Sequence, residues 1–274
     1  FTLTVNEVDV AKAETSGLKF YFNPANRSNA EENPAQYSYT NEDGEEFNVV
    51  FNNMKFVDGL DGWTGNSLLI PVGSSIDIDY KPFEEDVTPT NGKTFEVNFK
   101  VTDVYDYDTK VISCYANEKG IFITPNEGSL AISKSNIVDV QFAEDEDIKI
   151  SIVVTKRNEA EEGKRQLVYI YANGVISGVL KYSTNDNFSQ INASKVHIGS
   201  DEATVEVYNA RFYNVELSSY QILDNFIADV TWESRKSVSS DGLMSMNSNH
   251  ILVYAKNKKI KRNELDSLVT LENH

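Results

Sequence analysis

The stretch QLVYIYANGVISGVLKY, residues 166–182, decides the fold, because its pattern predicts a β-hairpin. Apolar and aromatic residues fill 167–171 and return at 175–180, on either side of Asn173 and Gly174. Asn-Gly is the strongest short-range hairpin signal, since both central positions of a type I′ turn need a positive φ. An isolated hairpin is only marginally stable in water, so this one needs a larger sheet to join.

Strand patterns fill most of the remaining chain. The clearest is TFEVNFKV, residues 94–101, in which alternate apolar residues share one face as side chains on a strand do. Further strands are expected at 1–10, 18–22, 37–39, 47–56, 68–72, 76–80, 111–115, 121–124, 129–133, 148–154, 195–199 and 204–213. Strands do not alternate with helices along the chain. The count and spacing therefore predict an all-β sandwich.

One helix is expected near the end of these strands. Ser218 and Gln221 have the spacing of a capping box, in which each side chain bonds the other residue's backbone N–H. Apolar residues then recur at spacings of three and four, which predicts one buried face made of Tyr220, Leu223, Phe226 and Ile227.

The ordered motifs of the second half resemble the laminin-G-like or concanavalin-A-like superfamily. They are YIYANGV at 169–175, Ile198-Gly199-Ser200, RFYN at 211–214 and LSSYQILDNFI at 217–227. The resemblance implies an antiparallel jelly-roll β-sandwich with one short C-terminal helix and an irregular tail. It covers residues 18–229, with 1–17 as a strand or linker from a preceding segment and 230–274 as a linker and tail toward a further module.

A narrower resemblance points to laminin-G-like modules in virion proteins of tailed bacteriophages. Its elements are the loops at 27–34, 61–63, 80–83 and 186–190. In such fibre, tail or head proteins the module contacts glycans or neighbouring subunits. The resemblance therefore implies a virion location, with a bacterial cell surface or a secreted protein as the alternative.

The composition limits the partners and the chemistry. A formal net charge of −17 argues against a nucleic-acid surface, which needs clustered Lys and Arg, and the apolar runs are too short for membrane insertion. Cys114 is the single cysteine, so no intramolecular disulfide is possible, and its apolar surroundings predict a buried, unreactive thiol. The KNKKIKR segment at 256–262 is expected to be a solvated turn, or else a docking patch for an acidic neighbour.

Catalytic patterns are missing from the sequence. Retaining glycoside hydrolases of this fold carry paired carboxylates on one strand, and no E-x-D-x-x-E string occurs. Asp77 and Asp79 share a strand face, but no third acid follows at the right spacing. The three histidines are scattered, which leaves a zinc site unsupported. The sequence therefore predicts a protein that is not an enzyme.

Glycan binding needs aromatic rings that stack on sugars, beside polar groups that bond hydroxyls. Trp63 with Asp61 and Asn66 has this chemistry, as do Tyr105 and Tyr107, although Trp63 could instead close one end of the core. No cofactor is required by the sequence. Calcium, which prefers oxygen ligands, is the one ion that the rim loops could hold, and the candidate ligands are Asp103, Asp106, Asp108 and Asp186.

The leading hypothesis is a non-enzymatic structural and adhesion module of a phage virion or surface protein. Its partners would be other subunits of a larger assembly and host-surface glycans. The second hypothesis is a stand-alone carbohydrate-binding module of a bacterial secreted or surface protein, and the third is a glycoside hydrolase of the same fold.

Overall fold

The computed structural model describes residues 12–83, 91–116, 119–126, 129–132, 140–142, 145–158, 166–182 and 195–236. The chain divides into two compact units, one of residues 14–223 and one of residues 1–13 with 224–274. The first unit contains all the described strands. The predicted strand at 1–10 and the predicted tail beyond residue 236 lie outside the described residues.

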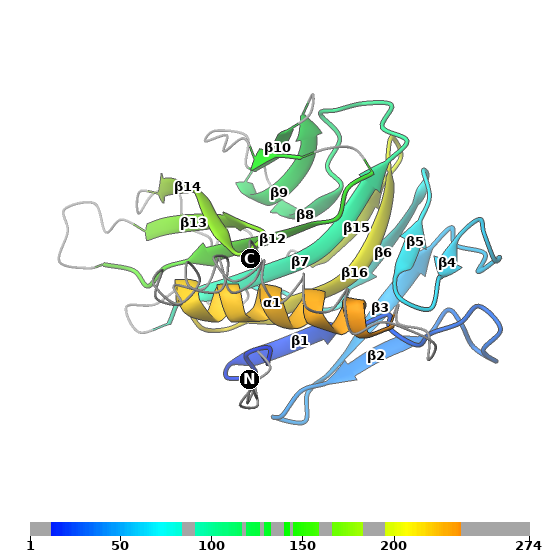
Figure 1. Ribbon diagram of the computed structural model, residues 1–274, viewed down its shortest axis with the longest axis horizontal. Helices are drawn as coiled ribbons and strands as arrows, with labels where there is room; N and C mark the ends of the chain where they lie inside the picture. The colour runs from blue at the N-terminus through cyan, green and yellow to red at the C-terminus, as the bar shows by residue number, and fades with distance from the viewer. Residues whose placement is uncertain are drawn as a thin grey trace, which may run out of the picture. The chain divides into compact units, whose positions relative to one another are not determined.

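The first unit is an antiparallel jelly-roll β-sandwich of two eight-stranded sheets, as the sequence predicted (Figure 1). Sheet A has the order β14 (Val175–Tyr182), β13 (Gln166–Ala172), β12 (Ile148–Val154), β7 (Lys93–Thr102), β16 (Thr204–Tyr213), β5 (Leu68–Ile70), β4 (Gly62–Trp63), and β1 (Leu18–Phe22) also pairs with β16. Sheet B has the order β11 (Val140–Gln141), β10 (Ser129–Ile132), β9 (Lys119–Asn126), β8 (Ile112–Ala116), β15 (Val196–Ser200), β6 (Ser74–Ile78), β3 (Glu46–Asn52), β2 (Tyr37–Thr40). Two short strands, β4 and β11, were not predicted, because two residues show no periodicity.

The core lies between the inner faces of the two sheets. Sheet A contributes alternate residues of β7 and β16, and sheet B contributes alternate residues of β6 and β15. The fully buried members on these four strands are Val97, Phe99, Val101, Val205, Val207, Ala210, Ile76, Ile78, Val196 and Ile198. This pattern confirms the period-two prediction for residues 94–101, except that Phe95 is only partly buried.

The predicted hairpin is formed by β13 and β14. Asn173 and Gly174 have φ values of 49° and 77°, as a type I′ turn requires. The turn is also tied to its neighbour, because the backbone N–H of Lys149 donates to Oδ1 of Asn173 at 2.9 Å. Asn173 returns a bond from its own N–H to the carbonyl of Lys149 at 2.8 Å. The hairpin therefore joins β12 through both the strand ladder and its turn.

The helix α1 (Ser219–Lys236) follows the strands and begins with the predicted capping box. The N–H of Ser218 donates to Oε1 of Gln221 at 2.9 Å, and the N–H of Gln221 donates to Oγ of Ser218 at 3.4 Å. The helix ends nine residues beyond the predicted Ile227, because no glycine or proline interrupts the chain between Ser218 and Lys236. The described residues contain no helix that is long and apolar enough to cross a membrane.

The predicted buried face of α1 is confirmed only in part, because Ile227 is buried, Leu223 and Phe226 are half-buried, and Tyr220 is exposed. Tyr220 is 69% exposed, whereas Ile222 is fully buried beside Leu217. Both Ile222 and Leu217 belong to a second apolar cluster on the outer face of sheet A, with Val153, Tyr171 and Tyr213. The first turn therefore packs against the sheet through Ile222. The predicted spacing of three and four residues, counted from Tyr220, does not include this position.

Gly199 explains the Ile-Gly-Ser motif in physical terms. Its φ is +122°, and a Cβ atom at this position would lie 2.4 Å from the carbonyl oxygen of Ser74 on β6. The glycine thus allows the backbones of β15 and β6 to approach each other closely. Any larger residue would have to strain its own backbone and push the two strands apart.

We predict that Gly199→Ala lowers the free energy of unfolding by about 3 kcal/mol, because backbone strain and overpacking add together. Gly44→Ala is the matched control, since Gly44 also has a positive φ, +81°, but no atom lies within 4 Å of the added Cβ. Only the strain, about 1 kcal/mol, should be lost there. Urea unfolding measures both. Equal losses for the two variants would contradict the crowding of Gly199.

Candidate functional site

Trp63, the first predicted glycan residue, lies in the core. The side chain is only 4% exposed, and four aromatic rings surround it at centroid distances of 5.6 to 6.3 Å. These rings belong to Phe22, Tyr37, Phe51 and Phe56. Its indole Nε1 donates to the carbonyl of Pro34 at 2.8 Å, so the polar atom of the ring is satisfied as well.

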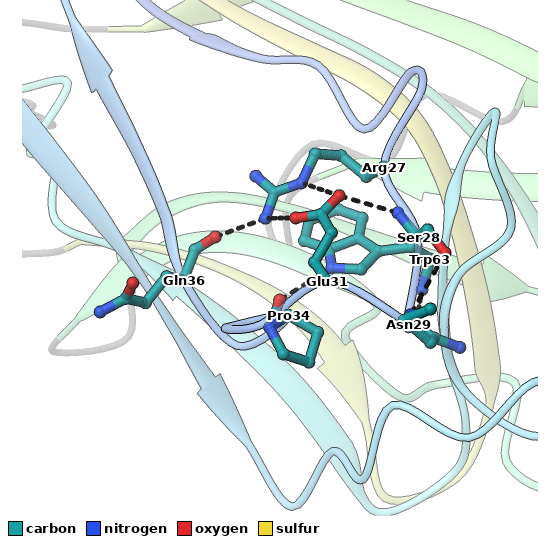
Figure 2. Close-up of polar contacts among 8 residues, drawn as sticks. Arg27, Ser28, Asn29, Glu31, Pro34, Gln36 and Trp63 are labelled. Atoms are coloured by element: carbon teal, nitrogen blue, oxygen red, sulfur yellow. Dashed lines mark hydrogen bonds and ion pairs between the residues drawn. The ribbon is translucent and has the colours of Figure 1, made fainter.

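Arg27 closes this aromatic cluster from the loop that follows β1. Figure 2 shows the guanidinium beside the indole, with the Arg27 Cζ atom 4.6 Å from the ring centroid of Trp63. The guanidinium is held in place by Glu31 at 2.8 Å and by the carbonyl of Gln36 at 2.8 Å. A bond from the Ser28 N–H is the main cause that lowers the pKa of Glu31, which keeps the pairing carboxylate ionised.

The neighbouring predicted residue Asp61 also holds the loop. The Asp61 carboxylate accepts from the backbone N–H groups of Lys55, at 2.5 Å, and Val57, at 2.8 Å. Asn66 is exposed on the turn that follows β4. Of the two interpretations of Trp63, the structure therefore favours the core plug, because the indole has no free face on which a sugar could stack.

Tyr105 and Tyr107 lie on an exposed loop between β7 and β8. Tyr105 is 73% exposed and Tyr107 is 38% exposed. The loop is anchored to the β15–β16 turn, because the N–H of Tyr105 donates to the carbonyl of Glu202 at 2.7 Å. A hydroxyl contact of 2.6 Å between Thr109 and Ser200 anchors its other end. The loop thus presents aromatic side chains to solvent from a fixed backbone.

The predicted calcium ligands are placed only in part. Asp103, Asp106 and Asp108 are exposed on this same loop, and the N–H of Asp108 donates to Oδ1 of Asp106 at 2.9 Å. Asp186 lies outside the described residues. Within the described residues no group of three His, Cys, Asp or Glu side chains could hold a metal ion. Calcium binding therefore stays a prediction.

Asp77 and Asp79 share the outer face of sheet B, and each is engaged. Oδ1 of Asp77 lies 2.8 Å from Nδ1 of His197, and Asp79 forms an ion pair of 2.6 Å with Lys195. The prediction that His197 lies in a strand is confirmed, but its pairing with Asp77 was missed. The alternation of both strands predicts that each side chain faces outward. It does not predict that two residues 120 positions apart lie on neighbouring strands.

Cys114 is buried, and burial raises the pKa of its thiol to about 12. The cause is desolvation, which disfavours the charged thiolate. Since the thiolate is the nucleophilic form, this side chain is inert at neutral pH. The structure agrees with the predicted buried hydrophobe.

Comparison with known proteins finds solved structures of similar fold, but it assigns the chain to no protein family. No protein-family model matches the chain, and no curated protein is significantly similar to it in sequence. Among solved structures, it is similar to the receptor-binding domain of botulinum neurotoxin D, with 12% identity, a TM-score of 0.50 and coverage of 74% of this chain and 53% of that one.

Two further structures are similar at lower TM-scores. One is the binding domain of botulinum neurotoxin DC in complex with rat synaptotagmin II, with 12% identity, a TM-score of 0.48 and coverage of 73% and 52%. The other is from botulinum neurotoxin type C, whose cell entry is dependent upon interaction with two ganglioside molecules, and it has 12% identity, a TM-score of 0.48 and coverage of 72% and 52%. The chain spans about half the length of these structures.

We predict that Trp63→Ala lowers the free energy of unfolding by about 3–5 kcal/mol, because it leaves a cavity inside the aromatic cluster. Tyr105→Ala, which removes an exposed ring, should stay within about 0.5 kcal/mol of the parent protein. Urea unfolding followed by tyrosine and tryptophan fluorescence measures both. If Trp63→Ala were as stable as Tyr105→Ala, the assignment of Trp63 to the core would be wrong.

We also predict that Cys114 does not react with a chromogenic disulfide reagent at pH 8 until the protein unfolds. Below pH 9 the thiol is neutral in both states, and between about 9 and 12 the unfolded chain loses its proton first, so this group lowers stability as pH rises. One thiol per chain should react in denaturant, and none in a Cys114→Ala variant. Rapid reaction of the folded protein would contradict the burial.

Proposed function

We propose that this chain is a non-enzymatic carbohydrate-binding module of a larger protein. The observation that carries the proposal is Tyr105, whose aromatic ring is 73% exposed on a loop that is anchored at Glu202 and Ser200. An exposed ring on a fixed backbone is positioned to bind a ligand at little cost in conformational entropy.

The surrounding groups have the chemistry that a sugar requires. Tyr107 adds a second ring, and the exposed carboxylates of Asp106 and Asp108 accept hydrogen bonds from hydroxyl groups. Each sugar hydroxyl both donates and accepts, so a loop that offers acceptors next to an apolar ring matches a sugar better than an apolar ligand. The loop therefore supports binding of glycans at the rim of the sandwich.

A binding role agrees with the known range of this fold. The receptor-binding domain of botulinum neurotoxin D has a similar fold, although 12% identity supports the fold alone. We further propose that the module lies in a phage virion protein, where it contacts host-surface glycans and other subunits of the assembly. The motifs at 27–34, 61–63 and 80–83 support this location, and a bacterial surface or secreted protein is the alternative.

We predict that the protein binds at least one glycan and that Tyr105→Ala weakens this binding about tenfold, through the loss of ring contact. Tyr220→Ala is the matched control, because Tyr220 is similarly exposed, at 69%, but lies on α1. A glycan array identifies the ligand, and calorimetry measures the dissociation constants of both variants.

Two outcomes would overturn this proposal. Absence of binding to every glycan tested would count against a carbohydrate-binding module and leave a structural role. Release of reducing sugar from any bound polysaccharide would show that the module is an enzyme.

A further inference from the structure

The outer face of sheet B carries a row of side chains that the proposed function has not used. β15 pairs with β6 on one side and with β8 on the other, so that His197 lies directly opposite both Asp77 and Ser113. Their neighbours Ile76, Ile78, Val196 and Ile198 point into the core and are fully buried. Because side chains alternate along each strand, Asp77, His197 and Ser113 all face outward.

Hydrogen bonds hold the centre of this row in one arrangement. Asp77 accepts from His197 through Oδ1 at 2.8 Å and from Nδ2 of Asn52 through Oδ2 at 2.7 Å. The amide of Asn52 also donates to Oγ of Ser75 at 3.2 Å. Yet Asp77 and His197 remain 39% and 40% exposed. The row is thus ordered before any ligand arrives and is still open to solvent.

The atoms of this row that are left for a ligand can form hydrogen bonds with a hydroxyl group. A carboxylate only accepts, so the proton that joins His197 to Asp77 sits on Nδ1, and Nε2 of the neutral ring is an acceptor. Neither Nε2 of His197 nor the Ser113 hydroxyl is hydrogen-bonded to any residue that the structure describes. A hydroxyl that donates to Nε2 can at the same time accept from Ser113.

The order of serine, histidine and aspartate across three strands does not make a hydrolase. Ser113 forms no hydrogen bond with His197 in the structure, and it lies in mid-strand between β9 and β15. The backbone N–H groups around it belong to the strand ladders, so they cannot form an oxyanion hole. The row therefore has the chemistry of a binding surface.

This surface carries little net charge, in contrast to the net charge of −17 of the whole chain. Asp79 forms an ion pair with Lys195 at 2.6 Å, and Asp77, which is hydrogen-bonded to the neutral ring of His197, leaves a single negative charge. Val50, directly opposite Asp77 on β3, adds an exposed apolar patch. A surface with donors, acceptors, an apolar patch and only one uncompensated negative charge fits a neutral, hydroxyl-rich ligand better than an anionic polymer.

Both ends of this surface lead to features that could extend it. Lys110, at the end of the Tyr105 loop, lies three residues before Ser113, which corresponds to about 10 Å along a strand. At the other end, Asp79 helps to line a polar pocket of ≈ 350 Å³ with Glu46, Lys81 and Asn214. The row therefore begins within about 10 Å of the rim loop, and it ends at a pocket of the size that small ligands occupy.

We propose that the outer face of sheet B, centred on Asp77 and His197, binds the chain of a neutral oligosaccharide whose end contacts the Tyr105 loop. The proposal rests on the glycan binding proposed above and states which sugars are bound and where. Neutral oligosaccharides should therefore bind more tightly as their length increases, until they span the row from the rim loop to His197.

The test is calorimetry of the full chain with a series of neutral oligosaccharides of increasing length, selected from the glycan array. His197→Ala and Asp77→Asn should each weaken binding of the longer sugars about tenfold, because each removes or misorients a hydrogen-bonding group. Ser38→Ala, on the exposed face of β2 in the same sheet, is the matched control and should bind as the parent does. Thermal unfolding of each variant checks that the sandwich is intact.

The outcomes separate this proposal from the proposed function. If the parent protein binds no glycan, the carbohydrate-binding function itself fails. If Tyr105→Ala loses binding while His197→Ala and Asp77→Asn keep it, glycans bind at the rim loop alone and the sheet-face site is overturned. Tighter binding of sialylated than of neutral sugars would also overturn it, since the surface carries no unpaired cation between Asp77 and Lys195 to favour an anion.

Discussion

The alternation of side chains along β7 is the constraint on which the rest of the sandwich depends. This strand pairs with β12 on one side and with β16 on the other, so its register fixes both neighbours. Its inner residues, such as Val97 and Phe99, are fully buried in the core. A slip of one residue would bring Glu96 and Asn98 into the core, so such a slip is strongly disfavoured.

The outer face of β7 is buried as well, which makes the constraint stricter. Glu96 is fully buried and lies 3.2 Å from Nζ of Lys149, which is also buried. The hydroxyl of Ser151 donates to the same carboxylate at 2.9 Å. A buried pair of this kind contributes little net stability, but removing one partner leaves an uncompensated charge. The main effect of the pair is therefore to destabilise alternative registers of β12 and β7, in which one of the two charges would be buried without its partner.

A bulge on β16 changes which of its residues face the core in the two halves of the strand. The register with β7 shifts between Val207 and Asn209, so the core positions change from Val205 and Val207 to Ala210 and Phe212. Arg211 then faces outward, where its guanidinium lies 4.7 Å from the ring centroid of Tyr21. The RFYN motif thus follows from the bulge, with Phe212 in the core and Arg211 on the outer face.

Local interactions could be predicted from the sequence, and distant ones could not. The turn at Asn173, the cap at Ser218 and the alternation of 94–101 each depend on residues a few positions apart, so the fold class follows from them. The place of Trp63 depends on Arg27, in a loop of polar composition 36 residues earlier, and the sequence left two interpretations open. The pairing of Asp77 with His197 depends on the strand order of sheet B, which no local pattern contains.

The distribution of charge decides which ligand the sheet face can bind. A chain with a net charge of −17 repels an anionic ligand at long range, whereas a neutral sugar meets no such barrier. Selectivity must then come from short-range hydrogen bonds, and these require polar side chains that are ordered yet exposed. On sheet B the side chain of His197 fulfils this condition, because its hydrogen bond to Asp77 orders the ring in the folded protein. A ligand therefore does not have to reduce the conformational entropy of this ring when it binds.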